Sequence, residues 1–382
     1  MVPHCISKLL FKIWKKLNMR VLMISGDVHV IKNLNGPFNL TLSELSKYWD
    51  SIDVLCPNLT GHKRQLNEKV KLIGVRKFLL FLDLYKILKS NQYDLIVTHD
   101  YGLMLNGLSV FVLRSFFKIP HISEIHHIEG YPQAVSIKER IYAILGKIYV
   151  RFVVKYLHGV RVDNQGDIVQ LLTKLGVCKS KILYIPPIYL ELDKYRPLNT
   201  EKEFDAIFVG RLVHNKGIFT ILNAVKILQK KNILIHLKLK GRGPLEEEIN
   251  AFIKENKLEN QVHIDKSILD EEQLITLYNK AKILICASTV EGGPRVTLEA
   301  MACNIPVIST PCGIMPEVIN NNDNGIIFDG SEKDLAAKIE NLLTNSELLQ
   351  KLQQNSRNSV LKYDYKITLK NYAEKYIECL DQ

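Results

Sequence analysis

Three features that mark other classes of protein are missing from this 382-residue sequence. There is no C-x-x-C pair and the seven cysteines are an odd number, so neither a zinc ribbon nor a closed set of disulfides is expected. No uninterrupted apolar run reaches the roughly 18 residues of a membrane-spanning helix, and the closest, 108–117, contains Arg114. The sequence also has no internal repeat. These absences favour a protein that folds in the reducing cytoplasm.

The composition predicts large cores and an anionic partner. Hydrophobic residues make up 47% of the chain and charged residues 24%, which excludes a disordered chain. At about 100 to 200 residues per domain, the length predicts two or three domains. The 51 Lys and Arg exceed the 40 Asp and Glu by 11. This excess favours nucleotides, phospholipid surfaces or nucleic acid as partners.

The first 18 residues have the pattern of a basic amphipathic helix. Apolar residues recur at helical spacing from Ile6 to Leu17 and include Trp14, while every charged residue among them is lysine. Such a helix can lie in an anionic membrane interface. It can equally pack on the protein's own surface, or be a leader upstream of a start at Met19. A secretory signal is not expected, because lysines interrupt the apolar stretch and no small-residue cleavage site follows.

From residue 19 onward, short β-branched runs alternate with helical segments, which predicts parallel sheets covered by helices. A proline-containing stretch of mixed charge interrupts this alternation before Phe204. We therefore predict an α/β protein with two Rossmann-like doubly wound domains that face each other across a cleft. The predicted domains are residues 19–190 and 204–360, with a linker at 191–203 and a last helical segment at 361–382.

The helix predicted over 137–156 carries an apolar stripe that we expect to face the core. Its members are Ile141, Ile144, Leu145, Ile148, Phe152 and Val153. Lys147, Arg151 and Lys155 are expected on a solvated face.

Two loops of the second domain carry the chemistry, each between a strand and a helix. The first, GRLVHNKG, spans residues 210–217 and places Arg211 and Lys216 in a glycine-bounded loop, where both can bind one diphosphate. The second, EGGPRVTLEAMA, spans 291–302 and separates Glu291 from Glu299 by seven residues. Its Gly292-Gly293-Pro294 run allows close approach of the backbone to a ligand, and the following helix start favours phosphate. Taken one at a time, these charges could also be ordinary surface residues.

Together the two loops resemble the signature of retaining glycosyltransferases of family 4, which have the GT-B fold. The matching residues are Gly210, Arg211, Leu212, Lys216, Gly217, Glu291 and Glu299, followed by EAMA at 299–302 and PVIST at 306–310. The similarity covers the chain from Met19 onward and is strongest over 204–328.

The resemblance implies a role for each matching residue. Arg211 and Lys216 would bind the donor diphosphate, Glu299 the ribose hydroxyls and Glu291 the hydroxyls of the transferred sugar. Gly293 and the backbone of Thr297 and Leu298 would add donor contacts. In the first domain, Gly36 and His126 would match a glycine-rich loop and a histidine that faces the sugar. His99 could be an acceptor-pocket residue or a strand-end histidine with ordinary partners. The last helix would cross back onto the first domain.

The implied activity is transfer of a hexosyl or other glycosyl group from a UDP or GDP sugar to a hydroxyl acceptor. The acceptor would be a glycan or a lipid-linked saccharide of cell-surface assembly. The sequence has no D-x-D triplet, the element by which metal-dependent glycosyltransferases hold a divalent ion, so no metal and no cofactor are expected. The expected location is the cytoplasm, either free or peripheral on the inner face of the cell membrane.

Two other functions would fit parts of the sequence. A non-catalytic anion-binding protein on membrane or nucleic acid would account for the positive charge, but no nucleic-acid fingerprint occurs and nucleic acid is not expected as a partner. A Rossmann oxidoreductase is excluded because GRGPLE, from Gly241, lacks the third glycine of the dinucleotide motif.

Overall fold

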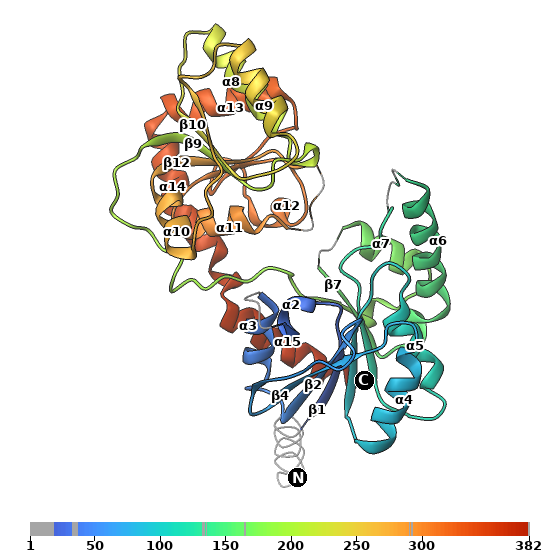
Figure 1. Ribbon diagram of the computed structural model, residues 1–382. Helices are drawn as coiled ribbons and strands as arrows, with labels where there is room; N and C mark the ends of the chain where they lie inside the picture. The colour runs from blue at the N-terminus through green and yellow to red at the C-terminus, as the bar shows by residue number, and fades with distance from the viewer. Residues whose placement is uncertain are drawn as a thin grey trace. The chain divides into compact units, whose positions relative to one another are not determined.

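The computed structural model describes residues 19–32, 37–131, 134, 136–163, 166–289, 291 and 293–380. The predicted leader at 1–18 and Gly36 lie outside these residues. The chain divides into two compact units (Figure 1). Unit 1 contains the described residues up to Pro187 and those from Lys366 onward, and unit 2 is Ile188–Tyr365. Both units are α/β, as predicted. No helix of the described residues is long and apolar enough to cross a membrane.

Unit 1 is built on a sheet of eight strands in the order β3-β4-β2-β1-β5-β6-β7-β8. The strands are β1 (Arg20–Ile24), β2 (Ser51–Pro57), β3 (Lys63–Asn67), β4 (Val70–Val75), β5 (Leu95–His99), β6 (His121–Glu124), β7 (Gly159–Val162) and β8 (Ile182–Tyr184). All neighbours pair in parallel except β3 with β4. Because the central strands are buried on both faces, they are almost continuously apolar, as in Val21–Ile24 and Leu95–Val97. β3 and β4 were not predicted, because Lys63–Asn67 is polar at an exposed edge.

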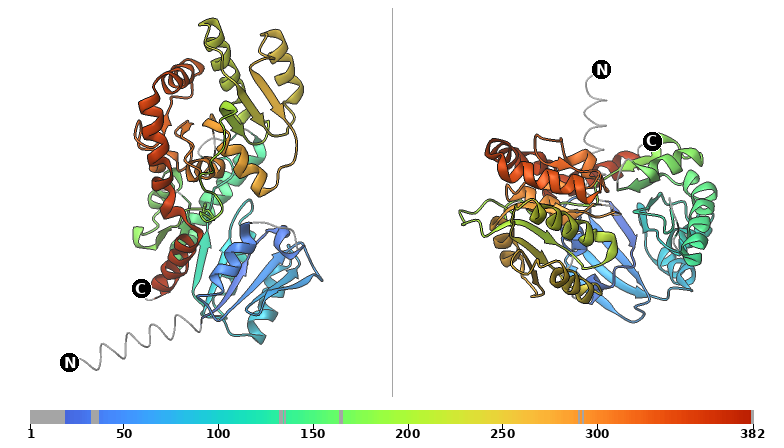
Figure 2. Two further views of the ribbon diagram at one scale, coloured as in Figure 1. Left: turned by 90° about the vertical axis from the view of Figure 1, so that its left-hand side faces the viewer. Right: turned by 90° about the horizontal axis from the view of Figure 1, so that it is seen from above.

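The helices of unit 1 cover both faces of its sheet. They are α2 (Val28–Ile31), α3 (Pro37–Leu45), α4 (Leu80–Ser90), α5 (Leu105–Leu113), α6 (Ile137–Phe152), α7 (Asp167–Lys174) and α15 (Tyr365–Leu380), with short 3-10 turns η1 (Val154–Tyr156) and η2 (Lys179–Lys181). The last helix, α15, lies beside the strands of this unit (Figure 2). Its Tyr372 and Tyr376 are buried with Trp49, Ile122 and other residues of the first half of the chain. The chain therefore returns to unit 1 at its end.

Unit 2 has a parallel sheet of six strands in the order β11-β10-β9-β12-β13-β14. The strands are β9 (Phe204–Val209), β10 (Leu237–Lys240), β11 (Val262–Asp265), β12 (Ala281–Cys286), β13 (Val307–Ser309) and β14 (Ile326–Ile327). In Figure 1 the sheet lies between two helix layers. Its helices are α8 (Ile218–Lys230), α9 (Glu246–Glu255), α10 (Glu271–Asn279), α11 (Arg295–Ala302), α12 (Met315–Val318), α13 (Glu332–Thr344) and α14 (Ser346–Val360), with turns η3 (His214–Lys216) and η4 (Leu361–Tyr363).

The unit boundaries differ from the predicted domain limits because the predicted linker 191–203 is packed onto unit 2. Leu192 and Tyr195 are buried in its core. The Arg357 guanidinium on α14 donates hydrogen bonds to the carbonyls of both residues, at 2.9 and 2.5 Å. Pro197 and the mixed charge of this segment correctly indicated irregular structure, but the segment is not a free linker. The chain passes between the units at 187/188 and again at 365/366.

The predicted core stripe of α6 is wrong at four of its six positions, whereas Val153, directly after the helix, is buried as predicted. Ile141, Ile144, Ile148 and Phe152 are 48–57% exposed. The helix is instead rotated so that small residues and Tyr149 face the core: Ala143, Gly146, Tyr149 and Val150 are its buried residues. Gly146 allows the close approach, since a Cβ there would lie 2.6 Å from the Ile128 side chain. The Tyr149 hydroxyl fixes the rotation by donating a 2.8 Å hydrogen bond to the buried carboxylate of Asp100.

Candidate active site

The two predicted loops of unit 2 open at the same edge of its sheet. β9 lies between β10 and β12 in the sheet. The chain that follows β9 forms β10 and β11 on one side of it, and then β12 to β14 on the other side. The loop after β9 carries Arg211 and Lys216, and the loop after β12 carries Glu291. The gap between two such strands at their carboxyl ends is where ligands bind in doubly wound sheets. The fold therefore brings together residues that are 75 positions apart in sequence.

Glycine holds these two loops against each other. Gly217 has a φ of 65° and its missing side chain lets the backbone lie over the end of β12, because a Cβ would lie 2.1 Å from the Ala287 carbonyl oxygen. The Thr289 amide donates a 2.9 Å hydrogen bond to the Asn215 carbonyl and joins the loops. A larger residue at 217 would separate the cation-bearing loop from Glu291.

Lys216 and Glu291 form an ion pair between the loops. The Lys216 Nζ donates to Oε1 of Glu291, which also accepts a 3.0 Å hydrogen bond from Oγ of Ser288. Burial lowers the pKa of Lys216, and the charge of Arg211 lowers it further. Arg211 itself is exposed. Two cations that repel each other in this way would both be stabilised by an anion placed between them.

A third loop that sequence reasoning missed lies beside the first. Residues 241–243 follow β10, and a Cβ on Gly241 would lie 1.8 Å from the Gly210 carbonyl oxygen. The amide of Leu212 donates a 2.8 Å hydrogen bond to the carbonyl of Arg242. Arg242 is exposed and follows the strand next to β9, so it adds a cation to the same edge. The sequence signal for this third loop is the Gly-Arg pair at 241–242, which repeats the Gly-Arg pair at 210–211 of the first loop.

Glu299 lies on α11 as predicted and is nearly buried, with a side chain 6% exposed. Its Oε2 accepts a 2.7 Å hydrogen bond from the Tyr278 hydroxyl, and its Oε1 accepts one of 2.8 Å from Nε of Arg295. A carboxylate has about four acceptor positions. These two bonds orient the group and leave capacity for hydroxyl donors.

The remaining predicted donor contacts lie at the start of α11. Gly293 is closely packed, since a Cβ there would lie 2.4 Å from Ile188. Leu298 is fully buried in the core of unit 2. Thr297 is also fully buried, and both its amide and its hydroxyl donate to the Pro294 carbonyl, at 3.0 and 2.6 Å. The Thr297 amide, expected to be free for phosphate, is therefore already hydrogen bonded in this structure.

In unit 1, His126 lies just beyond the carboxyl end of β6 and is held by a carboxylate that the sequence analysis did not identify. Its Nδ1 is 2.8 and 2.9 Å from the two oxygens of Asp163, which directly follows the neighbouring strand β7. Because a carboxylate only accepts, Nδ1 is the donor, and this pairing fixes the orientation of the ring. The His126 side chain is 38% exposed.

Behind His126 lies a fully buried carboxylate, Glu124. It accepts hydrogen bonds from Arg161 at 2.5 Å, from the Tyr376 hydroxyl at 2.7 Å and from the Tyr372 hydroxyl. Burial alone would raise the pKa of Glu124, but Arg161 and two histidines hold it well below its usual range. Glu124 is therefore a permanent negative charge behind the predicted site.

His99, at the end of β5, belongs to the same cluster. Its Nε2 is 3.5 Å from Oε2 of Glu124, and its ring packs edge-on to that of His126 at a centroid distance of 5.9 Å. Burial lowers the pKa of His99 to about 4. His99 is thus a neutral, mostly buried neighbour of His126. A signal for this cluster was present in the sequence, since a charged residue inside each of two apolar strands, Glu124 and Arg161, indicates a buried pair.

Residues 191–359 match the family model described as Glycosyl transferases group 1. The chain is 27% identical to an uncharacterized glycosyltransferase of Methanocaldococcus jannaschii over 77% of this chain and 78% of that protein. It is 26% identical, over 74% of each chain, to a Campylobacter jejuni enzyme named GalNAc-alpha-(1->4)-GalNAc-alpha-(1->3)-diNAcBac-PP-undecaprenol alpha-1,4-N-acetyl-D-galactosaminyltransferase.

Among solved structures, HepE of Anabaena in complex with UDP has a TM-score of 0.72 to this chain at 18% identity, covering 94% of this chain and 99% of HepE. That likeness extends over both units and confirms the predicted GT-B fold. The chain therefore has the GT-B fold, and its residues 191–359 match the model of the Glycosyl transferases group 1 family.

Proposed function

We propose that this protein is a retaining glycosyltransferase of family 4 that transfers a hexosyl or other glycosyl group from a UDP or GDP sugar to a hydroxyl of a glycan or lipid-linked acceptor. The observation that carries the proposal is the convergence of Arg211, Lys216 and Glu291 at the carboxyl ends of β9 and β12. The alternative of a non-catalytic anion-binding protein is not favoured, because the chain matches a family of enzymes.

Glycosyl transfer breaks the anomeric C–O bond, and negative charge develops on the departing nucleoside diphosphate. Arg211 and Lys216 are placed to hydrogen bond to that diphosphate, at about 1.5 to 3 kcal/mol for each charge-assisted bond. Lys216 would exchange part of its pairing with Glu291 for phosphate, which frees Glu291 to accept hydroxyls of the sugar. Glu299, oriented by Tyr278 and Arg295, would accept the ribose hydroxyls.

In a retaining reaction the acceptor hydroxyl attacks from the face that the leaving group departs from. Its proton then passes to a phosphate oxygen of the leaving group, so no separate carboxylate base is required. His126, held by Asp163, would orient and polarise the sugar. Gly293 and the start of α11 would contact the donor, and Gly36 would add a backbone contact on the side of unit 1.

The relatives support an acceptor that belongs to cell-surface glycan assembly. The Campylobacter jejuni relative is named for a saccharide on PP-undecaprenol, and a Staphylococcus aureus relative, 29% identical over 173 residues, is named for capsular polysaccharide biosynthesis. The structural relative HepE was solved with UDP. We extend these chemistries to this protein as its donor and acceptor classes.

The proposal includes metal-independent turnover and a cytoplasmic location at the inner face of the membrane. Fixed cations would stabilise the leaving group in place of a divalent ion. The basic amphipathic segment 1–18 would bind anionic lipid and bring the enzyme to a lipid-linked acceptor.

A panel of nucleotide sugars tests the donor site. UDP or GDP should raise the melting temperature of the full chain in the presence of EDTA, and the matching nucleotide sugar should be hydrolysed slowly to free sugar with its anomeric configuration retained. Stabilisation by polyanions or anionic vesicles alone would contradict the proposal. A strict requirement for Mg²⁺ or Mn²⁺ would contradict its metal-independent part.

A further inference from the structure

The outer face of α6 in unit 1 is apolar and exposed along its whole length. Ile137, Ile141, Ile144, Ile148 and Phe152 lie on one side of the helix and are 48–77% exposed. Such a continuous stripe is unusual on a protein surface that faces only water. It ends at η1, where Tyr156 is 57% exposed.

Cations accompany this stripe, and the one acid on α6 is Glu139 in its first turn. Residues 140–162 contain Arg140, Lys147, Arg151, Lys155 and Arg161 and no Asp or Glu. All but Arg161, which is paired with Glu124, belong to α6 or η1. A helix with an apolar face bordered by Lys and Arg is typical of segments that lie in the interface of an anionic bilayer.

The end of α5 continues the same apolar surface. Val112 is 61% and Phe116 is 71% exposed, and Phe116 and Phe117 pack against Tyr85 of α4. The 101–123 segment that contains α5 also has no acid, while it has Arg114 and Lys118. Figure 1 shows α4, α5 and α6 on the same side of unit 1.

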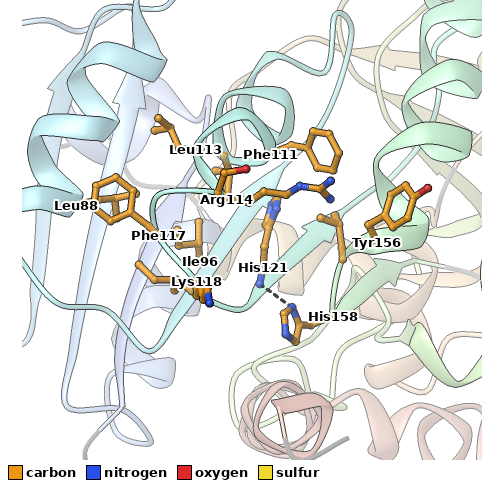
Figure 3. Close-up of a pocket in the computed structure, with 14 residues that line it drawn as sticks. Leu88, Ile96, Phe111, Leu113, Arg114, Phe117, Lys118, His121, Tyr156 and His158 are labelled. Carbon is orange, nitrogen blue, oxygen red and sulfur yellow. Dashed lines mark hydrogen bonds between the residues drawn. The ribbon is translucent and has the colours of Figure 1, made fainter.

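A cavity of about 400 Å³ opens in this surface, between the end of α5 and η1 (Figure 3). Most of its lining is apolar, and Arg114, Lys118, His121 and His158 are its basic residues. The Arg114 guanidinium lies 3.8 Å from the ring centroid of Phe111 and 5.3 Å from that of Tyr156. Because His121 begins β6, the cavity is at the amino end of that strand, away from the site around His126.

His121 lines this cavity, and its Nδ1 is buried without a hydrogen-bond partner among the described residues. The His121 residue is 4% exposed, and burial lowers its pKa to about 3, so the ring is neutral. Thr98 Oγ1 is 2.7 Å from an Asp100 oxygen and 2.8 Å from Nε2 of His121. Thr98 must donate to the carboxylate, so it accepts from Nε2–H. The neutral ring then has a lone pair on Nδ1, which needs a donor such as a hydroxyl.

We propose that this cavity is a binding site for one anionic phospholipid of a bilayer on which the α5–α6 face of unit 1 docks. The lipid phosphate contacts Arg114 and Lys118, a headgroup hydroxyl donates to Nδ1 of His121, and the apolar stripe of α6 enters the lipid interface. The site is distinct from the donor site and is independent of sugar transfer.

Vesicle sedimentation with the full chain tests this proposal. The probes are vesicles of phosphatidylcholine alone and vesicles with one third phosphatidylglycerol, which has headgroup hydroxyls. We expect binding to the phosphatidylglycerol vesicles, reduced at least about tenfold by Ile144→Asp with Ile148→Asp. All variants retain residues 1–18, so any contribution of that segment is constant. Equal binding to both vesicles, or unchanged binding of the α6 variant, would overturn the proposal.

Matched controls come from unit 2, where Leu234 and Ile268 are 68% and 81% exposed. Leu234→Asp with Ile268→Asp should bind vesicles like the parent, and a reduction equal to that of the α6 variant would count against the site. Should the α6 variant melt below the parent, Lys147→Glu with Arg151→Glu provides a second test with the same expected loss. If either variant changes only the oligomeric state, the face is a contact between copies and the proposal fails.

The cavity itself is tested by Arg114→Glu with Lys118→Glu. This variant should lose the preference for phosphatidylglycerol over phosphatidylmethanol, an anionic lipid of equal charge without a headgroup hydroxyl. Its hydrolysis of nucleotide sugar in solution should equal that of the parent. An unchanged preference, or stabilisation of the parent by inorganic phosphate equal to that by the vesicles, would overturn the lipid site.

Discussion

The predicted sites of the two units differ in how their charges are paired. In unit 2 the cations Arg211 and Arg242 are exposed. Burial and the charge of Arg211 lower the pKa of Lys216. A bound anion would therefore stabilise the cations of this site. In unit 1 the buried charge of Glu124 is matched within the fold by Arg161 and two tyrosines. Unit 2 is therefore suited to bind a diphosphate, and unit 1 to hold a histidine rigidly.

The two sites also depend on the chain in different ways. The residues of the unit 2 site come from loops within 210–299, inside one compact unit. The unit 1 site takes Glu124 and Asp163 from adjacent strands, but its buried carboxylate is completed by Tyr372 and Tyr376 from the far end of the chain. Changes at the C-terminus should therefore lower the stability of unit 1 and leave that of unit 2 unchanged.

The largest expected effect is on unit 1 when α15 is removed. A chain that ends at Tyr365 loses Tyr372 and Tyr376, both buried, and leaves Glu124 and Arg161 without their covering helix. Loss of two buried aromatic side chains should lower the stability of unit 1 by more than about 5 kcal/mol. Unit 2 retains all its residues. Thermal unfolding should show an early transition that nucleotide does not shift and a later one that it does. A single unchanged transition would contradict the division of roles.

The second largest effect is a loss of turnover caused by a substitution in unit 2. Arg211→Ala should lower kcat/KM for the nucleotide sugar by about 10²–10³-fold, because it removes a donor to the developing charge. The melting temperature should stay near that of the parent, since the side chain is exposed. Arg196→Ala, at another exposed arginine of unit 2, should leave kinetics and melting unchanged. Near-normal turnover in the Arg211 variant would remove the basis of the proposed donor site.

A smaller effect is a pH dependence that belongs to unit 1. Burial lowers the pKa of His99 to about 4, against about 6.5 in the unfolded chain. The unfolded state therefore binds more protons, and this contribution to stability is complete above about pH 6.5 and decreases as the pH falls toward 4. The slope is about 1.4 kcal/mol per pH unit for each proton.

Urea unfolding from pH 8 to 5 measures this dependence. His99→Phe should flatten it, leaving the part due to the buried His121, whereas His263→Gln, at an exposed histidine of unit 2, should not. An identical slope in the His99 variant would show that other groups cause the dependence.

The smallest expected effect tests how His126 is positioned. Asp163→Asn should lower kcat by about tenfold with little change in KM, because the ring loses its fixed orientation. The pH profile of kcat should also shift, which a purely structural change would not produce. Asp50→Asn, at an exposed aspartate of unit 1, is the control. In a His126→Gln background the Asp163 substitution should have almost no further effect on kcat. If the two effects are fully additive, Asp163 does not act through His126.

The parts of the site that the sequence predicted are those with local patterns. Arg211, Lys216, Glu291 and Glu299 lie in two short glycine-containing segments that can be read directly. Asp163, Arg161 and Arg242 were missed as site residues because each lies on, or directly after, a different strand from the residue that it accompanies. Strand order, which no local pattern specifies, makes them neighbours.

The α6 helix shows the same limit in the fold. Its length and helical period were predicted, but its rotation was not, because the apolar stripe and the true core face both repeat every three to four residues. The stripe has the larger side chains, and hydrophobicity alone selects it. The packing of Gly146 on Ile128 and the Tyr149–Asp100 hydrogen bond select the other face.

The sequence by itself determined the alternation of strands and helices, the two-unit organisation and the cation-bearing loops, because these follow from residues close together in the chain. Only the tertiary structure decided which strands are neighbours and which face of α6 is exposed. Those outcomes depend on packing and buried hydrogen bonds between residues far apart in sequence, and such energies are defined only once the chain has folded.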